Sequence, residues 1–243
     1  MKKIFTATLL ALATVSSFAS TTLTGTVRDF ASDGVNFEGS IIGLIPGMVN
    51  STLVGPSPTL TALGVSKIEP TNFSQWFTKP TNNVPVSLTL NETSPGSGIF
   101  AFSSSSFFPI DGLELGNQGN SHNYHFTYNI AAQFGYKPGT GQSFSFTGDD
   151  DVWVFFDKKL GIDLGGVHGA SSASVNLDTL LAGEAEGNYS FDFFFAERHT
   201  SESNLAISTS LTLTPAVPEP ETYALMAAGL SVLTFVARRR RRD

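Results

Sequence analysis

Apolar residues along this chain recur in short alternating runs that are typical of β-strands. The runs are rich in β-branched and aromatic residues and are bounded by Gly, Pro, Asn, Ser or Asp, which indicates a β-sandwich or a β-barrel. Helical periodicity is slight, and only Thr71–Thr78 and Asn176–Leu181 could form one or two turns. The predicted strands are Leu23–Arg28, Val84–Leu90, Ile99–Ser103, Tyr124–Ile130, Ser143–Thr147, Val152–Asp157, Tyr189–Ala196 and Leu205–Leu213.

Two of these runs also predict how they are covered. In VWVFF, residues 152–156, both alternating sets are apolar, so we expect this strand to be central and covered on both faces. In YSFDFFFA, residues 189–196, three phenylalanines share one face while Asp192 interrupts the other, which predicts a half-covered strand. The stretch 39–66 is apolar but is punctuated by Gly and Pro, and we expect loops there that cover one end of the sandwich.

Length and composition fit a single all-β domain. A chain of 243 residues with 41% hydrophobic residues, 23 Gly and 12 Pro can build one large core broken by many turns. Residues 20–217 hold 7 basic and 18 acidic side chains, a net charge of −11. Because nucleic-acid binding depends on neutralising phosphates with Lys and Arg, this acidic body excludes nucleic acid as a partner.

The N-terminus has the pattern of a secretory signal. MKKIFTATLLALATVSSFA, residues 1–19, has a basic start, an apolar middle and small residues at Ser17 and Ala19, so we expect a signal helix that is cleaved after Ala19. Exported proteins often carry disulfides, but this chain contains no Cys. The predicted domain, residues 20–214, must therefore be held by its core and by any ion that it binds.

The C-terminal segment, residues 215–243, has a second targeting pattern. Pro218, Glu219 and Pro220 precede an apolar run, residues 223–237, and an arginine tail, residues 238–242. At about 1.5 Å per residue the run covers roughly 22 Å, a short transmembrane helix that snorkelling arginines would extend. Since arginine clusters stay on the cytoplasmic side, the body would lie outside the inner membrane.

This C-terminal pattern resembles the PEP-CTERM sorting signal of Gram-negative bacteria that produce exopolysaccharides. In that family a membrane protease, exosortase, cuts near Pro-Glu-Pro and releases the protein to the cell surface or the extracellular matrix. The resemblance implies export through the inner membrane, transient anchoring and processing. A plain tail anchor is the alternative.

The run GDDDVWVFFDKK, residues 148–159, places three carboxylates before a buried strand. Ionised neighbours at a strand end repel one another and are costly to desolvate unless a cation compensates them. Ca²⁺ takes six to eight oxygen ligands in a flexible shell, and adjacent Asp residues can share one ion only through a tight turn or a cis peptide. The alternative is a turn whose carboxylates face water.

Six further segments have the pattern of a known family: GTVRDF, FFPIDG, HNYHFTY, FSFTGDDDVWVFFDKKLGIDLGGVH, VNLD and AERHTSESN. Together they resemble the fibro-slime domain, which is related to the protective-antigen-type domain, a jelly-roll-like antiparallel β-sandwich. In flocculins of the related family an Asp-Asp pair with a cis peptide holds Ca²⁺, and the ion binds sugar hydroxyls. The resemblance implies that Asp149 and Asp150 form the metal pair, with Asp151 and Glu197 as further candidates.

Other polar residues have a purely structural interpretation beside any functional one. Glu197 with Arg198 is either a ligand with its orienting partner or a polar strand end. The four histidines, His122, His125, His168 and His199, lack zinc-motif spacing, and we expect them to fix loops by hydrogen bonds. Gly165-Gly166 predicts a tight or positive-φ turn.

Nothing in the sequence predicts catalysis. Adjacent Asp residues are too close for the roughly 5 Å or more that separates glycosidase carboxylates, and the G-x-S-x-G elbow is absent. The sequence therefore predicts an exported, non-enzymatic surface or matrix protein with calcium-dependent binding of exopolysaccharide or cell-surface glycan. The alternatives are a structural matrix protein without a ligand and, less favoured, a polysaccharide hydrolase.

Overall fold

The computed structural model describes residues 18–32, 36–38 and 41–215. Residues 1–17 of the predicted signal helix (residues 1–19) lie outside the described residues, as do the Pro-Glu-Pro motif, the apolar run 223–237 and the arginine tail. No helix within the described ranges combines the length and hydrophobicity that a membrane crossing requires.

The described chain is built almost wholly of antiparallel strands, as the alternating runs predict. Three single-turn helices accompany them: α1 Ala62–Val65, α2 Pro70–Phe73 and α3 Leu177–Leu180. The strands are β1 Ser20–Asp29, β2 Asn83–Glu92, β3 Phe100–Ser104, β4 Phe126–Tyr136, β5 Ser143–Gly148, β6 Asp151–Phe156, β7 Lys159–Leu164, β8 Ser171–Asn176, β9 Gly187–Glu197, β10 Leu205–Thr209 and β11 Leu213–Pro215.

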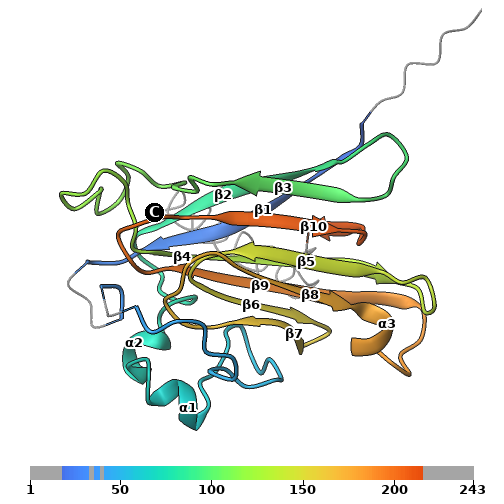
Figure 1. Cartoon of the computed structure of the whole chain (residues 1–243), viewed down its shortest axis with the longest axis horizontal. Helices are drawn as coiled ribbons and strands as arrows, with labels where there is room; N and C mark the ends of the chain where they lie inside the picture. The colour runs from blue at the N-terminus through green and yellow to red at the C-terminus, as the bar shows by residue number, and fades with distance from the viewer. Residues whose placement is uncertain (1–17, 33–35, 39–40, 216–243) are drawn as a thin grey trace, which may run out of the picture.

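All strands belong to one continuous sheet of 11 strands in the order β7-β6-β9-β4-β1-β2-β3-β10-β5-β8, with β11 pairing β4. The sheet curls until its edge strands β7 and β8 approach each other, which gives a nearly closed, barrel-like shape (Figure 1). The all-β antiparallel prediction is confirmed. The expected two-sheet sandwich is in fact one curled sheet, because neighbouring strands stay hydrogen-bonded along the whole path.

The inside of the curled sheet holds the main core. The alternate residues Val152, Val154 and Phe156 of β6 pack there, beside the phenylalanines of β9 that share one face. Rings from neighbouring strands meet edge-on, such as Phe156 and Phe191, whose centroids are 5.5 Å apart. Such tilted aromatic packing is favourable because the edge of one ring meets the face of the other.

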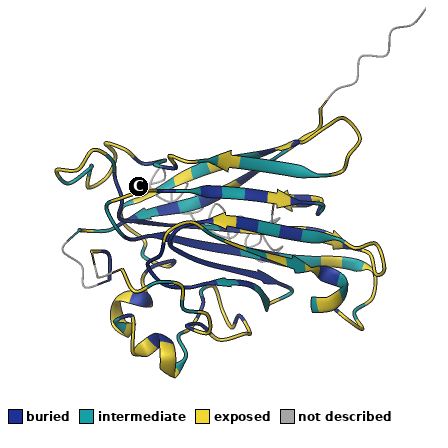
Figure 2. Cartoon of the chain, in the orientation of Figure 1, coloured by how far each residue is buried: buried dark blue, intermediate teal, exposed yellow. Residues whose placement is uncertain are grey.

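A second core lies on the outer face of β6 and β9. Trp153, Phe155 and Phe194 are buried there beneath loops that carry α1 and α2. Phe73 of α2 meets Trp153 edge-on at 5.8 Å between ring centroids. Every residue of β6 is therefore buried, as predicted from its apolar pattern (Figure 2).

Three details differ from the predictions. Strand β6 is not central, since it lies second from the edge of the sheet, between β7 and β9. Its outer face is nevertheless buried, because loops cover it. The stretch 41–66 includes α1 and covers mainly this outer face, while its first residues reach the loop between β7 and β8 at one end of the barrel, as expected. On β9 the outer face is half covered at Asp192 but is buried at Phe194.

Periodicity did not reveal β7 or β8, although the family resemblance implies a return strand where β7 lies, and one predicted strand is split. Strand β7 follows a two-residue turn in which Asp157 and Lys158 both have positive φ, a hairpin geometry usually signalled by Asn-Gly or Asp-Gly. Strand β8, SSASVN, consists largely of small polar residues that do not favour strands in isolation. The predicted strand 205–213 is broken into β10 and β11.

Candidate functional site

The acidic turn lies in a pocket at one end of the barrel. Asp149 and Asp150 connect β5 to β6, and Glu197 ends β9. Because β6 pairs with β9 in a register that places Asp151 opposite Ala196, the end of β9 lies beside the turn. The pocket has a volume of about 230 Å³ and is lined by Ile41, Asp149, Asp150, Val167, His168, Gly169, Glu197, His199, Ser201 and Glu202.

Asp149 and Asp150 are joined by a cis peptide bond. Consecutive residues on a trans extended strand project to opposite faces, but here both carboxylates line the same pocket. Each residue is only 4% exposed. This is one of the two backbone geometries expected for adjacent Asp residues that share an ion.

Backbone N–H groups hold the two carboxylates in place. Asp149 accepts hydrogen bonds from the backbone N–H of Asn204 at 2.5 Å and from its side-chain amide at 3.1 Å. Asp150 accepts from the backbone N–H of His168 at 2.9 Å and of Arg198 at 3.0 Å. Since a carboxylate oxygen has two lone pairs, each of these oxygens keeps capacity for a cation.

Burial makes ionisation of these carboxylates unfavourable in the metal-free protein. Loss of water raises the pKa of Asp150 to about 7, and the neighbouring charge of Asp151 adds to the shift. Burial also raises the pKa of Asp149. The pKa of Glu197 lies well above its usual range because of burial and the charges of Asp150 and Asp149. A cation in the pocket would reverse these effects.

Glu197 is the buried carboxylate of this pocket that has an unpaired oxygen. The residue is 1% exposed, and its Oε2 has no hydrogen-bond partner among the residues that the structure describes. An unpaired acceptor buried beside two other carboxylates is costly, and a hard cation is the ligand that such oxygen donors prefer. Asp149, Asp150 and Glu197 are therefore candidate oxygen ligands for a hard cation such as Ca²⁺, which would need further ligands to complete its shell.

Asp151, the further metal candidate, turns away from this pocket. Its Oδ1 accepts from the backbone N–H of Gly166 at 2.6 Å, and its Oδ2 forms an ion pair with Arg198 Nε at 2.6 Å. The guanidinium N–H does not point directly at this oxygen, so charge and not a linear hydrogen bond holds the pair. Arg198 also lies 5.2 Å from the ring centroid of Trp76. Arg198 thus forms its ion pair with Asp151, and not with Glu197, whose orienting partner it was in one of the two interpretations.

The side chains alone do not form a complete metal cage. In the described part of the chain, no three His, Asp or Glu side chains are arranged as a metal-binding group. A Ca²⁺ ion at Asp149, Asp150 and Glu197 would therefore need backbone carbonyls, water or ligand hydroxyls to complete its shell. The same finding gives no support to a zinc site at the histidines.

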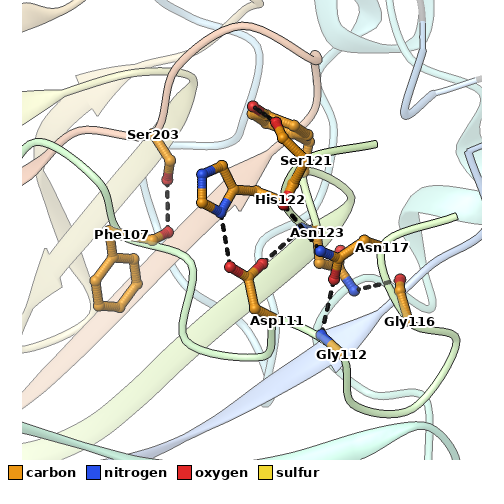
Figure 3. A network of polar contacts seen from close by, with 10 residues as sticks. Phe107, Asp111, Gly112, Gly116, Asn117, Ser121, His122, Asn123 and Ser203 are labelled. Carbon is orange, nitrogen blue, oxygen red and sulfur yellow. Dashed lines mark hydrogen bonds and ion pairs between the residues drawn. The ribbon is translucent and has the colours of Figure 1, made fainter. Parts of the chain in front are cut away.

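The histidines mostly fix loops, as expected. His122 Nδ1 lies 2.7 Å from Asp111 Oδ2, and its ring stacks on Phe108 at 4.0 Å between centroids. Figure 3 shows the Asp111 carboxylate pointing toward His122, with its other oxygen accepting from the Asn123 backbone at 2.7 Å. His125 Nε2 lies 3.0 Å from Glu38 Oε1. These contacts fix the connection between β3 and β4.

Sequence reasoning missed several residues of the pocket. His168 was considered only as a loop residue, yet its backbone N–H binds Asp150 and its ring lines the pocket. Glu202, Val167 and Ile41 also line it and had no role in the prediction. A backbone N–H donor cannot be recognised from the sequence, and these residues lie on separate loops that only the tertiary structure brings together.

Comparison with known proteins defines the class to which this β-fold and its acidic turn belong. The PA14 domain model matches residues 74–219, more than half of the chain. The chain therefore belongs to the PA14 domain family. The PEP-CTERM protein-sorting motif matches residues 216–242, which confirms the predicted sorting segment and implies export to the surface of a Gram-negative bacterium and processing by exosortase. The narrower resemblance to the fibro-slime domain stays a prediction.

The relatives are longer proteins of Dictyostelium discoideum. Protein psiQ is 42% identical over 191 residues, which cover 71% of this chain and 19% of psiQ. Protein psiC is 46% identical over 153 residues, 58% of this chain and 29% of psiC. Protein psiE is 37% identical over 234 residues, 84% of this chain and 46% of psiE. The chain thus spans less than half the length of each.

Two solved structures are similar at low identity. The PA14 domain of the MpAFP antifreeze protein has a TM-score of 0.38 and 8% identity, covering 87% of this chain and 100% of that domain. The PA14 sugar-binding domain from an RTX adhesin has a TM-score of 0.35 and 12% identity, covering 80% of this chain and 98% of that domain.

Proposed function

We propose that this protein is an exported, non-enzymatic surface or matrix protein that binds glycans through a Ca²⁺ ion held by Asp149, Asp150 and Glu197. The observation that carries the proposal is the pocket in which three buried carboxylates meet, one of them with an unpaired oxygen. Membership of the PA14 family and the sorting motif support the setting at the cell surface.

The donor set favours Ca²⁺ over other divalent ions. All candidate ligand atoms of Asp149, Asp150 and Glu197 are oxygens, and the chain contains no Cys. Ca²⁺ accepts irregular shells of six to eight oxygens, whereas Mg²⁺ demands a near-ideal octahedron and keeps its waters. A bound Ca²⁺ would supply coordination of sugar hydroxyls, as in the flocculins. The protein's own residues hold the ion and shape the opening.

The pocket is also suited to a small unit of a larger glycan. Its volume of about 230 Å³ lies below the roughly 300–1,000 Å³ of pockets that enclose drug-sized ligands. One terminal or side-branch sugar fits such a site better than an internal stretch of polymer. We further propose transient membrane anchoring through residues 223–237 before exosortase processing.

Calorimetry with Ca²⁺ and Mg²⁺ tests the metal site. We expect Ca²⁺ to bind and, at a hundredfold excess over its dissociation constant, to stabilise the protein by about 2.7 kcal/mol. For a domain of this size that corresponds to a rise in Tm of about 5–10 °C. Asp150→Asn should abolish binding, whereas Asp192→Asn, a matched control on β9 outside the pocket, should leave it unchanged.

Glycan-array binding, measured with Ca²⁺ and with chelator, tests whether the protein binds glycans through the ion. Signal that requires Ca²⁺ and is lost in Asp150→Asn supports glycan binding through the ion. Binding that persists in chelator refutes the role of calcium. Calcium binding without any glycan signal favours a structural matrix protein.

A further inference from the structure

The pocket that holds the buried carboxylates also has aliphatic residues in its lining. Ile41 is 63% exposed and Val167 is buried, and both line this pocket. A single exposed aliphatic residue is ordinary on a protein surface. This one lines the same pocket as the buried carboxylates, so its side chain is available to a ligand bound there.

The backbone holds Ile41 in this position. The backbone N–H groups of Ile42 and Gly43 both donate to the Val167 carbonyl, at 3.2 and 2.9 Å. Ile45 donates to the Gly165 carbonyl at 2.6 Å. The segment 41–45 is therefore docked on the loop between β7 and β8 by three hydrogen bonds, and Ile41 is its first residue.

The adjacent glycines of that loop, Gly165 and Gly166, allow this docking. Gly166 has φ +108°, and a Cβ at this residue would lie 2.3 Å from the Gly43 carbonyl oxygen. The same Gly166 donates to Asp151 beside the acidic pair. The Gly-Gly motif therefore joins the aliphatic rim to the carboxylates in one rigid arrangement, so that the two kinds of surface face one ligand together.

The charge of the pocket limits the ligand as well. Four carboxylates line it, those of Asp149, Asp150, Glu197 and Glu202. They outnumber the two charges of one divalent cation, so the loaded pocket stays negative. The positive charge of Arg198 is balanced by Asp151, with which it forms an ion pair, so it does not change this count. A uronate or a sulfated sugar would be repelled.

We infer that the pocket selects a neutral sugar that carries a methyl group against Ile41, as part of a 6-deoxy position or of an acetyl substituent. This inference rests on the proposed function, since it names the class of sugar that the calcium site would take. Removing Ile41 from water requires an apolar partner, and a hydroxymethyl group would leave its hydroxyl against the aliphatic side chain.

Matched sugar pairs test the inference on the full-length protein in Ca²⁺. L-rhamnose with L-mannose and L-fucose with L-galactose differ only by the 6-hydroxyl, whereas N-acetylglucosamine with glucose tests an acetyl group. We expect the methyl-bearing member of at least one pair to bind about tenfold more tightly, the low end for one methyl in a hydrophobic pocket. Galacturonate should bind more weakly than galactose.

Ile41→Ser should remove this preference while keeping Ca²⁺ affinity unchanged. Leu44→Ser is the matched control, because Leu44 is 44% exposed on the same segment but does not line the pocket. Equal affinity within every pair, or a preference that survives Ile41→Ser, overturns the inference while calcium-dependent binding stands. The absence of Ca²⁺-dependent binding to any sugar overturns the proposed function itself.

Discussion

The buried ion pair between Arg198 and Asp151 should carry a large share of the stability at this end of the barrel. The two side chains are 3% and 0% exposed, and their nearest atoms are 2.6 Å apart. Arg198→Met would leave the Asp151 charge buried without its partner, which typically costs 3–5 kcal/mol. At about 2–4 °C per kcal/mol for a domain of this size, Tm should fall by about 6–20 °C.

The surface ion pair between Lys159 and Glu184 provides the control. The charged atoms lie 2.8 Å apart, but the side chains are 40% and 38% exposed, so water screens the pair and Lys159→Met should leave the free energy of unfolding nearly unchanged. Urea unfolding of both variants measures the difference. Adding Asp151→Asn to Arg198→Met should recover part of the loss, since it removes the stranded charge. A loss for Arg198→Met no greater than that for Lys159→Met would refute this reasoning.

Two further predictions concern the pocket and its supporting loop. Gly166→Ala should lower the free energy of unfolding by about 1–3 kcal/mol, because the φ of Gly166 is +108° and an added Cβ would meet the Gly43 carbonyl. Gly169→Ala is the control: this residue has open space around it, so the same urea assay should show no change. Burial raises the pKa of Asp150 to about 7, so the metal-free folded state binds this proton more tightly than the unfolded chain. The unfolding free energy in chelator should therefore fall as pH rises from about 4 to about 7, and Asp150→Asn should lack this component; an equal gap between wild type and variant at every pH would contradict it.

The strands that the sequence predicts well are those whose side chains report burial directly. Strand β6 is apolar on both faces, and both faces are buried. An apolar pattern on both faces predicts that both faces of a strand are covered, but not where the strand lies in the sheet. For this reason β6 was wrongly expected to be central. Strand β8 escaped notice because its place depends on pairing with β5 and not on its own small polar residues.

The candidate site was predictable only in part, for a related reason. Charge repulsion beside an apolar strand pointed to the acidic run 149–151, and the family resemblance pointed to Asp149, Asp150 and Glu197 within the predicted site. The structure brings these three together in one pocket but turns Asp151 toward Arg198. The alternation of apolar and polar residues could not predict that the Asp151 side chain points toward Arg198, since that orientation depends on the backbone geometry at the turn. Ile41 lies more than a hundred residues from the acidic turn, and no local pattern connects them.

The acidic pair is anchored mainly by main-chain amides contributed by His168, Arg198 and Asn204. An amide hydrogen is present whatever side chain follows it, and only proline removes it. The loops around the acidic pair can therefore exchange their side chains without losing these hydrogen bonds. If the pocket binds sugars as proposed, new sugar preferences could arise at its rim while the two carboxylates stay in place.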